Sequence, residues 1–141
     1  MNPIRASWAL DGPLTITTNT APTRMGATDP TGFVRNGKVW RADRFASGPV
    51  ALAMWATARA LHAEAWGDGA HEAVAGVPTL VGLTDDPSGF DPTPHRLVLD
   101  MSRSHPGIRL GQTGRVFDAA LRAVLGQKVL ALQAKRSFRA L

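Results

Sequence analysis

The strongest local pattern of hydrophobic and polar residues lies in residues 33–41, FVRNGKVWR, where two apolar residues stand on each side of a polar centre. At the centre of this stretch, Asn36 and Gly37 can both adopt a positive φ, which a two-residue type I′ hairpin turn requires. Counting outward from the turn gives three cross-strand pairs: Phe33–Trp40, Val34–Val39 and Arg35–Lys38. Because aromatic and β-branched pairs stabilise neighbouring strands, the pattern predicts a β-hairpin that turns at Asn36-Gly37.

Two other stretches are less decisive. Residues 50–66 are rich in alanine, which favours a helix, whereas their alternating apolar positions favour two strands with a bend near residues 57–59. Periodicity alone leaves both interpretations open. Residues 10–18, LDGPLTITT, place Leu14 and Ile16 between polar residues after an Asp-Gly-Pro turn, so we expect a strand there.

The spacing of apolar residues changes from period 2 to period 3.6 after residues 84–94, a loop with three prolines that is the best candidate for a domain boundary. Before this loop, residues 70–75 and a turn opened by Pro78 are predicted to be helical. After it, residues 95–104 are predicted to form a helix with Leu97, Val98 and Met101 inward. Two apolar rows with helical spacing follow: Phe117, Leu121, Val124, Leu125, Val129 and Leu132, and then Leu130, Ala134, Phe138 and Leu141.

The chain ends at Leu141, within the second apolar row and without a Gly, Asn or Pro that would stop a helix. We therefore expect the sequence to be cut inside a helix. Helices that lose their partners in this way leave large apolar side chains in water, so we expect them to pack poorly or to self-associate.

Charge is distributed unevenly along the chain, whose formal net charge is +5. Residues 101–141 contain eight basic residues and one acid, Asp118, whereas residues 1–100 contain eight basic and ten acidic residues. A basic segment beside a slightly acidic one indicates an anionic partner for the carboxyl-terminal part. The alternative is a solvated helix face without a partner.

Several classes of protein are disfavoured by what the sequence lacks. There is no cysteine, so disulfides and thiolate metal sites are excluded. No run of about 18 apolar residues is present, and the first residues do not resemble a secretory signal. We therefore expect a reduced, cytoplasmic protein without a membrane span.

Individual side chains give few chemical signals. The four histidines have no metal-ligand spacing, and no phosphate-binding loop or nucleophile elbow occurs. We therefore expect no metal and no cofactor. The adjacent Asp85 and Asp86 lie in the proline-rich loop and are interpreted as turn and cap residues. The tryptophans could stack on a base, but strand positions favour the core, so we expect core positions for Trp8, Trp40, Trp55 and Trp66.

Residues 105–138, HPGIRLGQTGRVFDAALRAVLGQKVLALQAKRSF, resemble the segment of 3-methyladenine DNA glycosylases in which an HPGLR turn leads into the first long helices of the glycosylase domain. RAVLGQKV, at Arg122–Val129, is the most specific part. Upstream, VWRADR, AEAWGDGA and DDPSGFDP are similar to the amino-terminal region of an actinobacterial-type subgroup. The four stretches occur in the right order, and the resemblance extends from Leu10 onward.

The resemblance implies an α+β fold. Residues 1–88 would form a small antiparallel sheet with helices, similar to one half of the TATA-binding protein, which favours strands over a helix in residues 50–66. Residues 89–141 would begin the all-helical glycosylase domain of the helix-hairpin-helix superfamily. The family hydrolyses the N-glycosidic bond of alkylated bases such as 3-methyladenine in double-stranded DNA after base flipping.

The resemblance also limits which functional residues can be assigned. The family's catalytic aspartate follows a helix-hairpin-helix, and both would lie beyond Leu141, so we expect no catalytic residue in this chain. Gln127 and Lys128 match the point where two helices meet near the DNA, and we assign them to DNA binding together with Arg122 and Lys135. The best-known members have an apolar wedge at the position of Lys128; a lysine can instead reach a phosphate.

A second departure from the family occurs at Leu130, where a hydroxyl residue often caps the next helix. Leucine cannot cap, so we expect that helix start to be weaker by about 1 kcal/mol.

Three hypotheses follow. The first is a truncated DNA repair glycosylase that is inactive by itself. The second is a non-catalytic module that binds nucleic acid or protein through its basic end, and the third is a folded remnant without function.

Overall fold

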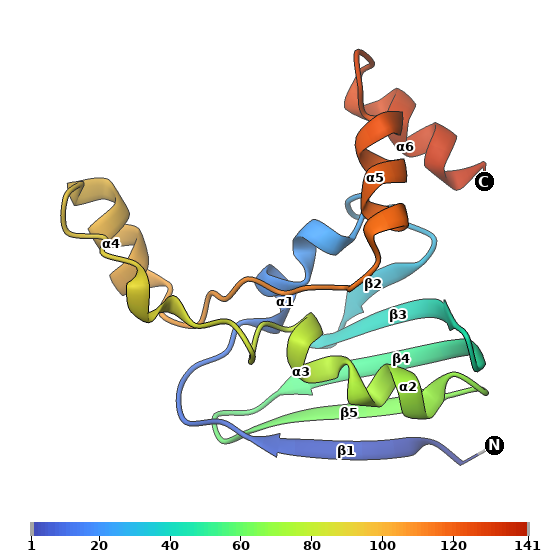
Figure 1. Cartoon of the computed structure of the whole chain (residues 1–141), viewed down its shortest axis with the longest axis horizontal. Coiled ribbons are helices and arrows are strands. Elements are labelled where there is room, and N and C mark those ends of the chain that lie inside the picture. The colour runs from blue at the N-terminus through green and yellow to red at the C-terminus, as the bar shows by residue number, and fades with distance from the viewer. Residues whose placement is uncertain (1, 141) are drawn as a thin grey trace.

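The computed structural model describes residues 2–140 and has a five-stranded antiparallel sheet at its centre, with the spatial order β1-β5-β4-β3-β2 (Figure 1). The strands are β1 (Ile4–Ala9), β2 (Gly32–Arg35), β3 (Lys38–Phe45), β4 (Gly48–Ala56) and β5 (Ala60–Trp66). The helices are α1 (Ile16–Asn19), α2 (Ala70–Ala75), α3 (Val77–Leu80), α4 (Arg96–Ser104), α5 (Val116–Leu125) and α6 (Ala131–Arg139), with short 3₁₀ turns η1 (Ala21–Thr23) and η2 (Pro87–Gly89). The α+β class is confirmed.

The predicted hairpin is confirmed in both its turn and its register. Asn36 has φ 52° and Gly37 has φ 73°, as a type I′ turn requires. β2 and β3 pair through Phe33–Trp40, Val34–Val39 and Arg35–Lys38. Residues 50–66 are also two strands, joined near residues 57–59, so the strand interpretation is the right one.

The strand expected in residues 10–18 is wrong. The first strand is β1, where the alternating residues Ile4, Ala6 and Trp8 pack toward the core. The Asp-Gly-Pro sequence at residues 11–13 ends this strand rather than opening the next one. Ile16 then begins α1 and is 4% exposed, because burying its side chain in the core outweighs the preference of the neighbouring threonines for extended backbone.

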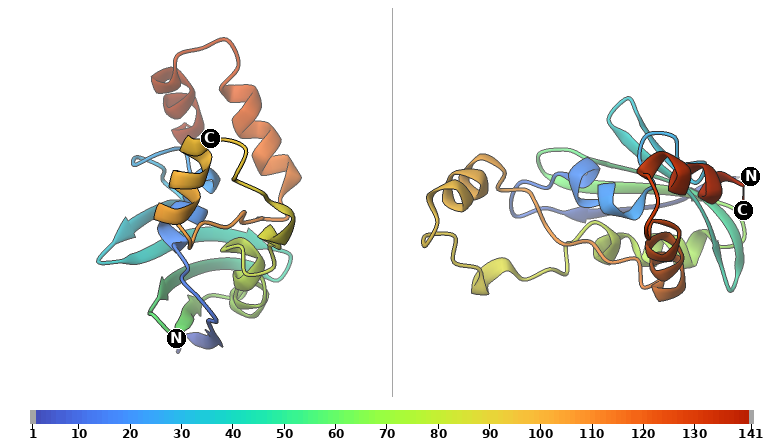
Figure 2. Two further views of the ribbon diagram at one scale, coloured as in Figure 1. Left: turned by 90° about the vertical axis from the view of Figure 1, so that its left-hand side faces the viewer. Right: turned by 90° about the horizontal axis from the view of Figure 1, so that it is seen from above.

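One face of the sheet holds the hydrophobic core. The strand register aligns Val39, Met54 and Ala63, each at most 1% exposed. The core cluster adds residues of α1, α2 and α3, so these helices cover the same face (Figure 2). Trp8 packs against this core, as expected.

The other three tryptophans do not lie in the core. Trp40 and Trp55 occupy the alternate positions of β3 and β4, and Trp66 shares their face through its register with Ala51. The expectation of core positions is therefore wrong for these three. Strand periodicity places residues on two faces but does not say which face is covered.

α4 forms where residues 95–104 predict a helix, but it stands away from the sheet (Figures 1 and 2). Leu97, Val98 and Met101 were expected to face inward. They are 64%, 38% and 52% exposed, so within residues 2–140 this expectation is wrong. The helical pattern is local and forms the helix, whereas the cover for its apolar side depends on tertiary contacts.

After α4 the chain returns to the sheet. Asn19, only 4% exposed, donates from Nδ2 to the carbonyl oxygens of Val81 (3.0 Å) and Gly107 (3.3 Å) and accepts from the amide of Arg109 (3.1 Å). A β-carbon on Gly107 would meet Thr15 Oγ1 at 2.7 Å, so this close approach needs glycine. The return segment thereby connects the core to the α5–α6 pair.

The two adjacent aspartates of the proline-rich loop act as local acceptors. Asp86 accepts a hydrogen bond from the amide of Ser88 (3.0 Å) and caps η2, which confirms the predicted role. Asp85 accepts from the amide of Leu110 at 2.9 Å and so holds the loop against the return segment. No helix among residues 2–140 is long and apolar enough to cross a membrane.

Candidate nucleic-acid interface

Gln127 and Lys128 lie at the exposed tip where α5 ends and α6 has not yet begun. Lys128 has φ 54°, a conformation that residues with a β-carbon rarely adopt, so the turn is sharply defined at this position. Both side chains are exposed. The structure therefore places these two predicted DNA-binding residues together.

α6 begins without a side-chain acceptor at its N-cap, since Leu130 occupies that position. The amide of Leu130 is satisfied instead by Gln133 Oε1 at 3.1 Å. This contact is one half of a capping box, and the half that needs a hydroxyl or carboxylate is missing. The expected weakness of about 1 kcal/mol at this helix start remains a prediction.

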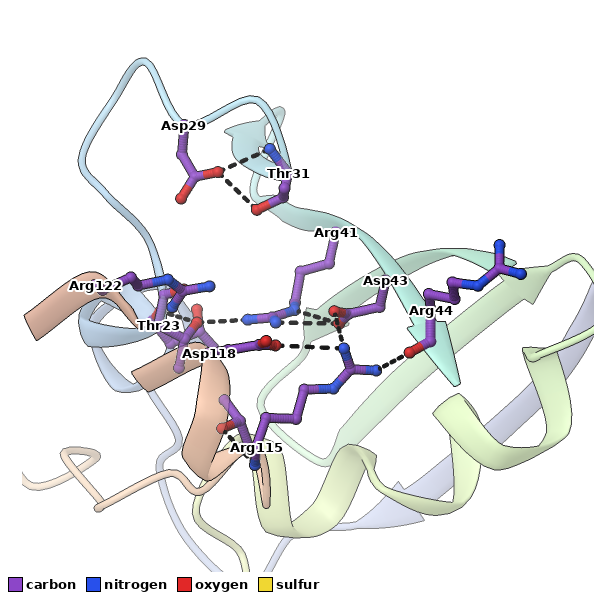
Figure 3. A network of polar contacts seen from close by, with 11 residues as sticks. Thr23, Asp29, Thr31, Arg41, Asp43, Arg44, Arg115, Asp118 and Arg122 are labelled. Carbon is purple, nitrogen blue, oxygen red and sulfur yellow. Dashed lines mark hydrogen bonds and ion pairs between the residues drawn. The ribbon is translucent and has the colours of Figure 1, made fainter. Parts of the chain in front are cut away.

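A network of arginines and aspartates joins this helical pair to the sheet (Figure 3). Its buried centre is Arg41 on β3, which is 7% exposed. Arg41 Nη1 donates to Thr23 Oγ1 at 2.5 Å, and Nε and Nη2 donate to Asp43 Oδ2 at 3.2 and 3.1 Å. A buried charge that is paired and hydrogen-bonded in this way avoids most of the cost of its desolvation.

Arg115 extends the network to the start of α5. Its Nη1 lies 3.1 Å from Asp43 Oδ1 and 3.4 Å from Asp118 Oδ2. Its Nη2 donates to the carbonyl oxygen of Arg44 at 2.6 Å, and its guanidinium lies 4.6 Å from the ring centroid of Phe45. Asp43 thus bridges Arg41 and Arg115, which attaches α5 to the end of β3.

Arg122, another predicted DNA-binding residue, lies half-buried on α5. Its Nη1 donates to the carbonyl oxygen of Thr23, and its guanidinium lies 5.4 Å from the ring centroid of Phe138 on α6. The side chain therefore links η1, α5 and α6. These contacts suit a residue that positions the helical pair.

Lys135 is the fourth predicted DNA-binding residue and lies half-buried on α6. Its ammonium group is so near Gly26 that a β-carbon there would meet Nζ at 2.9 Å. Gly26 itself has φ 88°. Lys135 and Arg122 thus lie against the sheet side of the helical pair, apart from the exposed Gln127 and Lys128.

Asp29 holds the loop beneath α6 in shape. The residue is 7% exposed. Its carboxylate accepts hydrogen bonds from the amides of Met25 (2.6 Å) and Thr31 (2.7 Å) and from Thr31 Oγ1 (2.6 Å). Burial of the carboxyl opposes its ionisation, but these hydrogen bonds and the charge of Arg122 outweigh burial and lower the pKa of Asp29.

Asp29→Asn is expected to lower the free energy of unfolding near neutral pH by about 1–2 kcal/mol, because an amide cannot accept all three hydrogen bonds. The pKa of Asp29 is lower in the folded state, so its stabilisation is present above the unfolded pKa and is lost as pH falls through the folded pKa. Urea unfolding from about pH 7 to about pH 3 should therefore show a steeper loss for the original chain than for the variant. Asp11→Asn, at an exposed position, is the control, and identical pH curves for all three proteins would contradict this role.

The network surrounds a hollow of about 360 Å³, whose lining includes Asp43, Arg115, Asp118, Arg122 and Phe138. Four of the five charged residues of this lining already contact one another, the backbone or an aromatic ring, and the fifth, Arg44, accepts a hydrogen bond from Arg115 through its carbonyl oxygen. We interpret the hollow as part of the contact between sheet and helices. Arg41 and Asp43 were not among the predicted site residues. Arg41 ends the predicted hairpin, and Asp43 shares its face only because β3 continues to Phe45.

Comparison with known proteins identifies the fold. No protein-family model and no curated protein matches the sequence. Among solved structures, a 3-methyladenine DNA glycosylase from Archaeoglobus fulgidus matches 92% of this chain with a TM-score of 0.70 and 16% sequence identity. The match covers 47% of that protein, so this chain spans about half its length. The chain thus has a DNA-glycosylase-like fold.

Proposed function

We propose that this chain forms part of a DNA N-glycosylase of base excision repair, the type that releases alkylated bases such as 3-methyladenine from DNA after base flipping. The observation that carries the proposal is the fold match to a 3-methyladenine DNA glycosylase across 92% of the chain. It is supported by the resemblance of residues 105–138, which include α5, α6 and the turn between them. The same proposal includes three finer points: the protein belongs to the actinobacterial-type subgroup, it is cytoplasmic, and its helix-hairpin-helix lies outside these residues.

Within this proposal, the α5–α6 turn contacts duplex DNA. Lys128 reaches a phosphate and Gln127 lies beside it at the exposed tip, whereas Arg122 and Lys135 support the turn from the sheet side. α6 also carries Arg136 and Arg139, which add positive charge on exposed positions. Positive charge on one exposed edge favours a polyanion over a neutral ligand.

We also propose that the chain by itself does not hydrolyse the glycosidic bond. Asp118, the single acid among residues 101–141, accepts from Arg115 in the network, and Asp43 and Asp29 are likewise engaged. None of these carboxylates lies at the exposed turn. The division into a sheet domain at residues 1–88 and a helical part at 89–141 remains part of the proposal.

The exposed apolar residues of the helices favour a second candidate, a module that binds a protein partner or a second copy of itself. Val116, Phe117 and Val124 on α5 are 81%, 77% and 61% exposed. Large apolar side chains gathered on a surface often mark an interface. Such a module would associate through α5 and α6 without binding DNA.

Duplex binding by the turn is tested with a labelled, methylated DNA duplex and fluorescence anisotropy at several salt concentrations. Lys128→Ala is expected to weaken binding about equally for all sequences and to reduce the salt slope of the logarithm of affinity by about 1, as for one phosphate contact. Arg103→Ala, an exposed arginine on α4, is the matched control. Equal affinity and slope for both variants would contradict a DNA contact at Lys128.

A further inference from the structure

The face of the sheet opposite the core carries a row of aromatic rings. Phe33 on β2 and Trp40 on β3 have ring centroids 6.1 Å apart at an interplanar angle of 12°. Trp40 and Trp66 on β5 have the same separation at 13°. β3 and β5 are not neighbours, since β4 lies between them, so the two indoles meet above β4.

The small residues of β4 make this arrangement possible. Ala53 pairs with Trp40, and Ala51 pairs with Trp66. Ala53 points to the same face as these tryptophans and yet is 0% exposed, which requires the surrounding side chains to cover it. The indoles of Trp40 and Trp66 therefore cover the centre of the sheet, and each remains partly exposed to water.

A second aromatic pair lies beside the first row. Trp55 on β4 and His62 on β5 are stacked with centroids 5.3 Å apart at 19°. Lys38 Nζ lies 3.7 Å from the ring centroid of Trp55, which is a cation–π contact. Positive charge is thus placed directly among the aromatic rings.

The remaining charges on this face are mostly positive. By strand alternation the outward positions include Arg5, Arg35, Lys38 and Arg44. Glu64 is the single acid among the outward positions of the five described strands, and Arg5 Nε already pairs with its Oε1 at 2.8 Å. Three cations therefore remain without a carboxylate on this face.

A hollow of about 440 Å³ lies at the hairpin end of the face, lined by Phe33, Arg35, Asn36, Lys38 and Trp40. Its volume is within the range of small-ligand pockets. The lining combines two aromatic rings, two cations and an amide. Aromatic side chains for bases and cations for the backbone are the combination that binds single-stranded nucleic acids.

We propose that this outward sheet face binds single-stranded nucleic acid, with a base against Phe33 and Trp40 and the phosphates near Arg35 and Lys38. A base can reach an aromatic side chain only when its own face is free, as it is in a single strand and is not inside a duplex. The unpaired cations favour a polyanion. This surface is on the opposite side of the sheet from the core helices and does not depend on the proposed glycosylase function.

The test uses the whole chain and a labelled oligothymidine of about 12 nucleotides, read by anisotropy and by quenching of tryptophan fluorescence. Arg35→Glu/Lys38→Glu is expected to weaken binding at least about tenfold, and Phe33→Ala about tenfold, since one stacked base is lost. The matched control is Arg96→Glu/Arg103→Glu on α4, which reverses two exposed charges away from the sheet and should leave affinity unchanged.

Thermal unfolding of each variant shows whether the hairpin still folds. Phe33→Leu keeps an apolar side chain but removes the ring, so it should also weaken binding if a base stacks on Phe33. Loss of affinity in the sheet variants with quenching of tryptophan fluorescence would support the proposal. The proposal would be overturned by equal affinity in the sheet and control variants, by a duplex of the same length whose affinity the sheet variants reduce as much as that of oligothymidine, or by an acidic protein that binds this face while oligothymidine does not.

Discussion

Arg41→Ala is expected to lower the free energy of unfolding by about 3 kcal/mol, the largest effect of any single substitution considered. Arg41 is 7% exposed and donates to both Thr23 and Asp43. Removing one member of a buried ion pair typically costs about 3–5 kcal/mol, because the partner stays buried without its counter-charge. Asp43 retains Arg115 at 3.1 Å, so we expect the lower end of this range.

Urea unfolding followed by circular dichroism measures this loss. Arg44→Ala is the matched control, because Arg44 lies on the same strand with an exposed side chain that points away from the network (Figure 3). Its substitution should change stability by less than about 0.5 kcal/mol. A loss in Arg41→Ala no larger than the loss in Arg44→Ala would show that the buried contacts of Arg41 with Thr23 and Asp43 do not stabilise the fold.

The second large effect concerns the amide protons of α5 and α6. In dilute monomer we expect the free energy of opening for amide exchange to be at least about 2 kcal/mol lower in residues 116–139 than in the central strands. The reason is that α5 and α6 bury little apolar surface. Val129, Leu130 and Leu132 are 46%, 73% and 57% exposed, so each gains only part of the about 1.5–3 kcal/mol that full burial of such a side chain contributes. Leu125 and Phe138 are half-buried, and Leu141 lies outside the described residues.

Hydrogen exchange followed by mass spectrometry or NMR measures this difference, and sedimentation at the same concentration shows whether the chain is monomeric. Val39 and Met54, on the central strands, supply the internal reference for full protection. Protection of α5 and α6 equal to that of β3 and β4 in a proven monomer would contradict the prediction. It would also remove the physical basis for association through these helices.

The elements that sequence patterns predicted well are those determined by a few neighbouring residues. The hairpin depends on Asn36 and Gly37, which accept positive φ at little cost, and both its turn and its register were predictable. The first turn of α3, which contains Pro78, and the cap at Asp86 depend on similarly local rules.

The elements that were mispredicted depend on contacts between distant residues. Ile16 lies in a helical turn because the core accepts its side chain, and Asn19 is held by Val81 and Gly107 far along the chain. The position of Trp40 on the open face could not be deduced from its strand alone. Which of two alternating faces is covered is decided by where the helices pack.

In the candidate site, too, local sequence predicted some features, whereas others depend on contacts between distant residues. The resemblance in residues 105–138 pointed to Gln127 and Lys128, and the structure places both at an exposed turn. The inward contacts of Arg122 with Thr23, 99 residues apart in sequence, require the tertiary structure. Positive charge alone does not distinguish a cation that contacts a ligand from one that supports the fold.

We propose above all that the α5–α6 turn of this glycosylase-like fold contacts double-stranded DNA. The most direct measurement is an NMR titration of the isotope-labelled chain with a short duplex that contains a methylated purine. We expect the largest amide shifts at residues 126–130, with Lys128 foremost, and smaller shifts along α6. Shifts confined to the sheet or to α4, or no shifts at low salt, would contradict it.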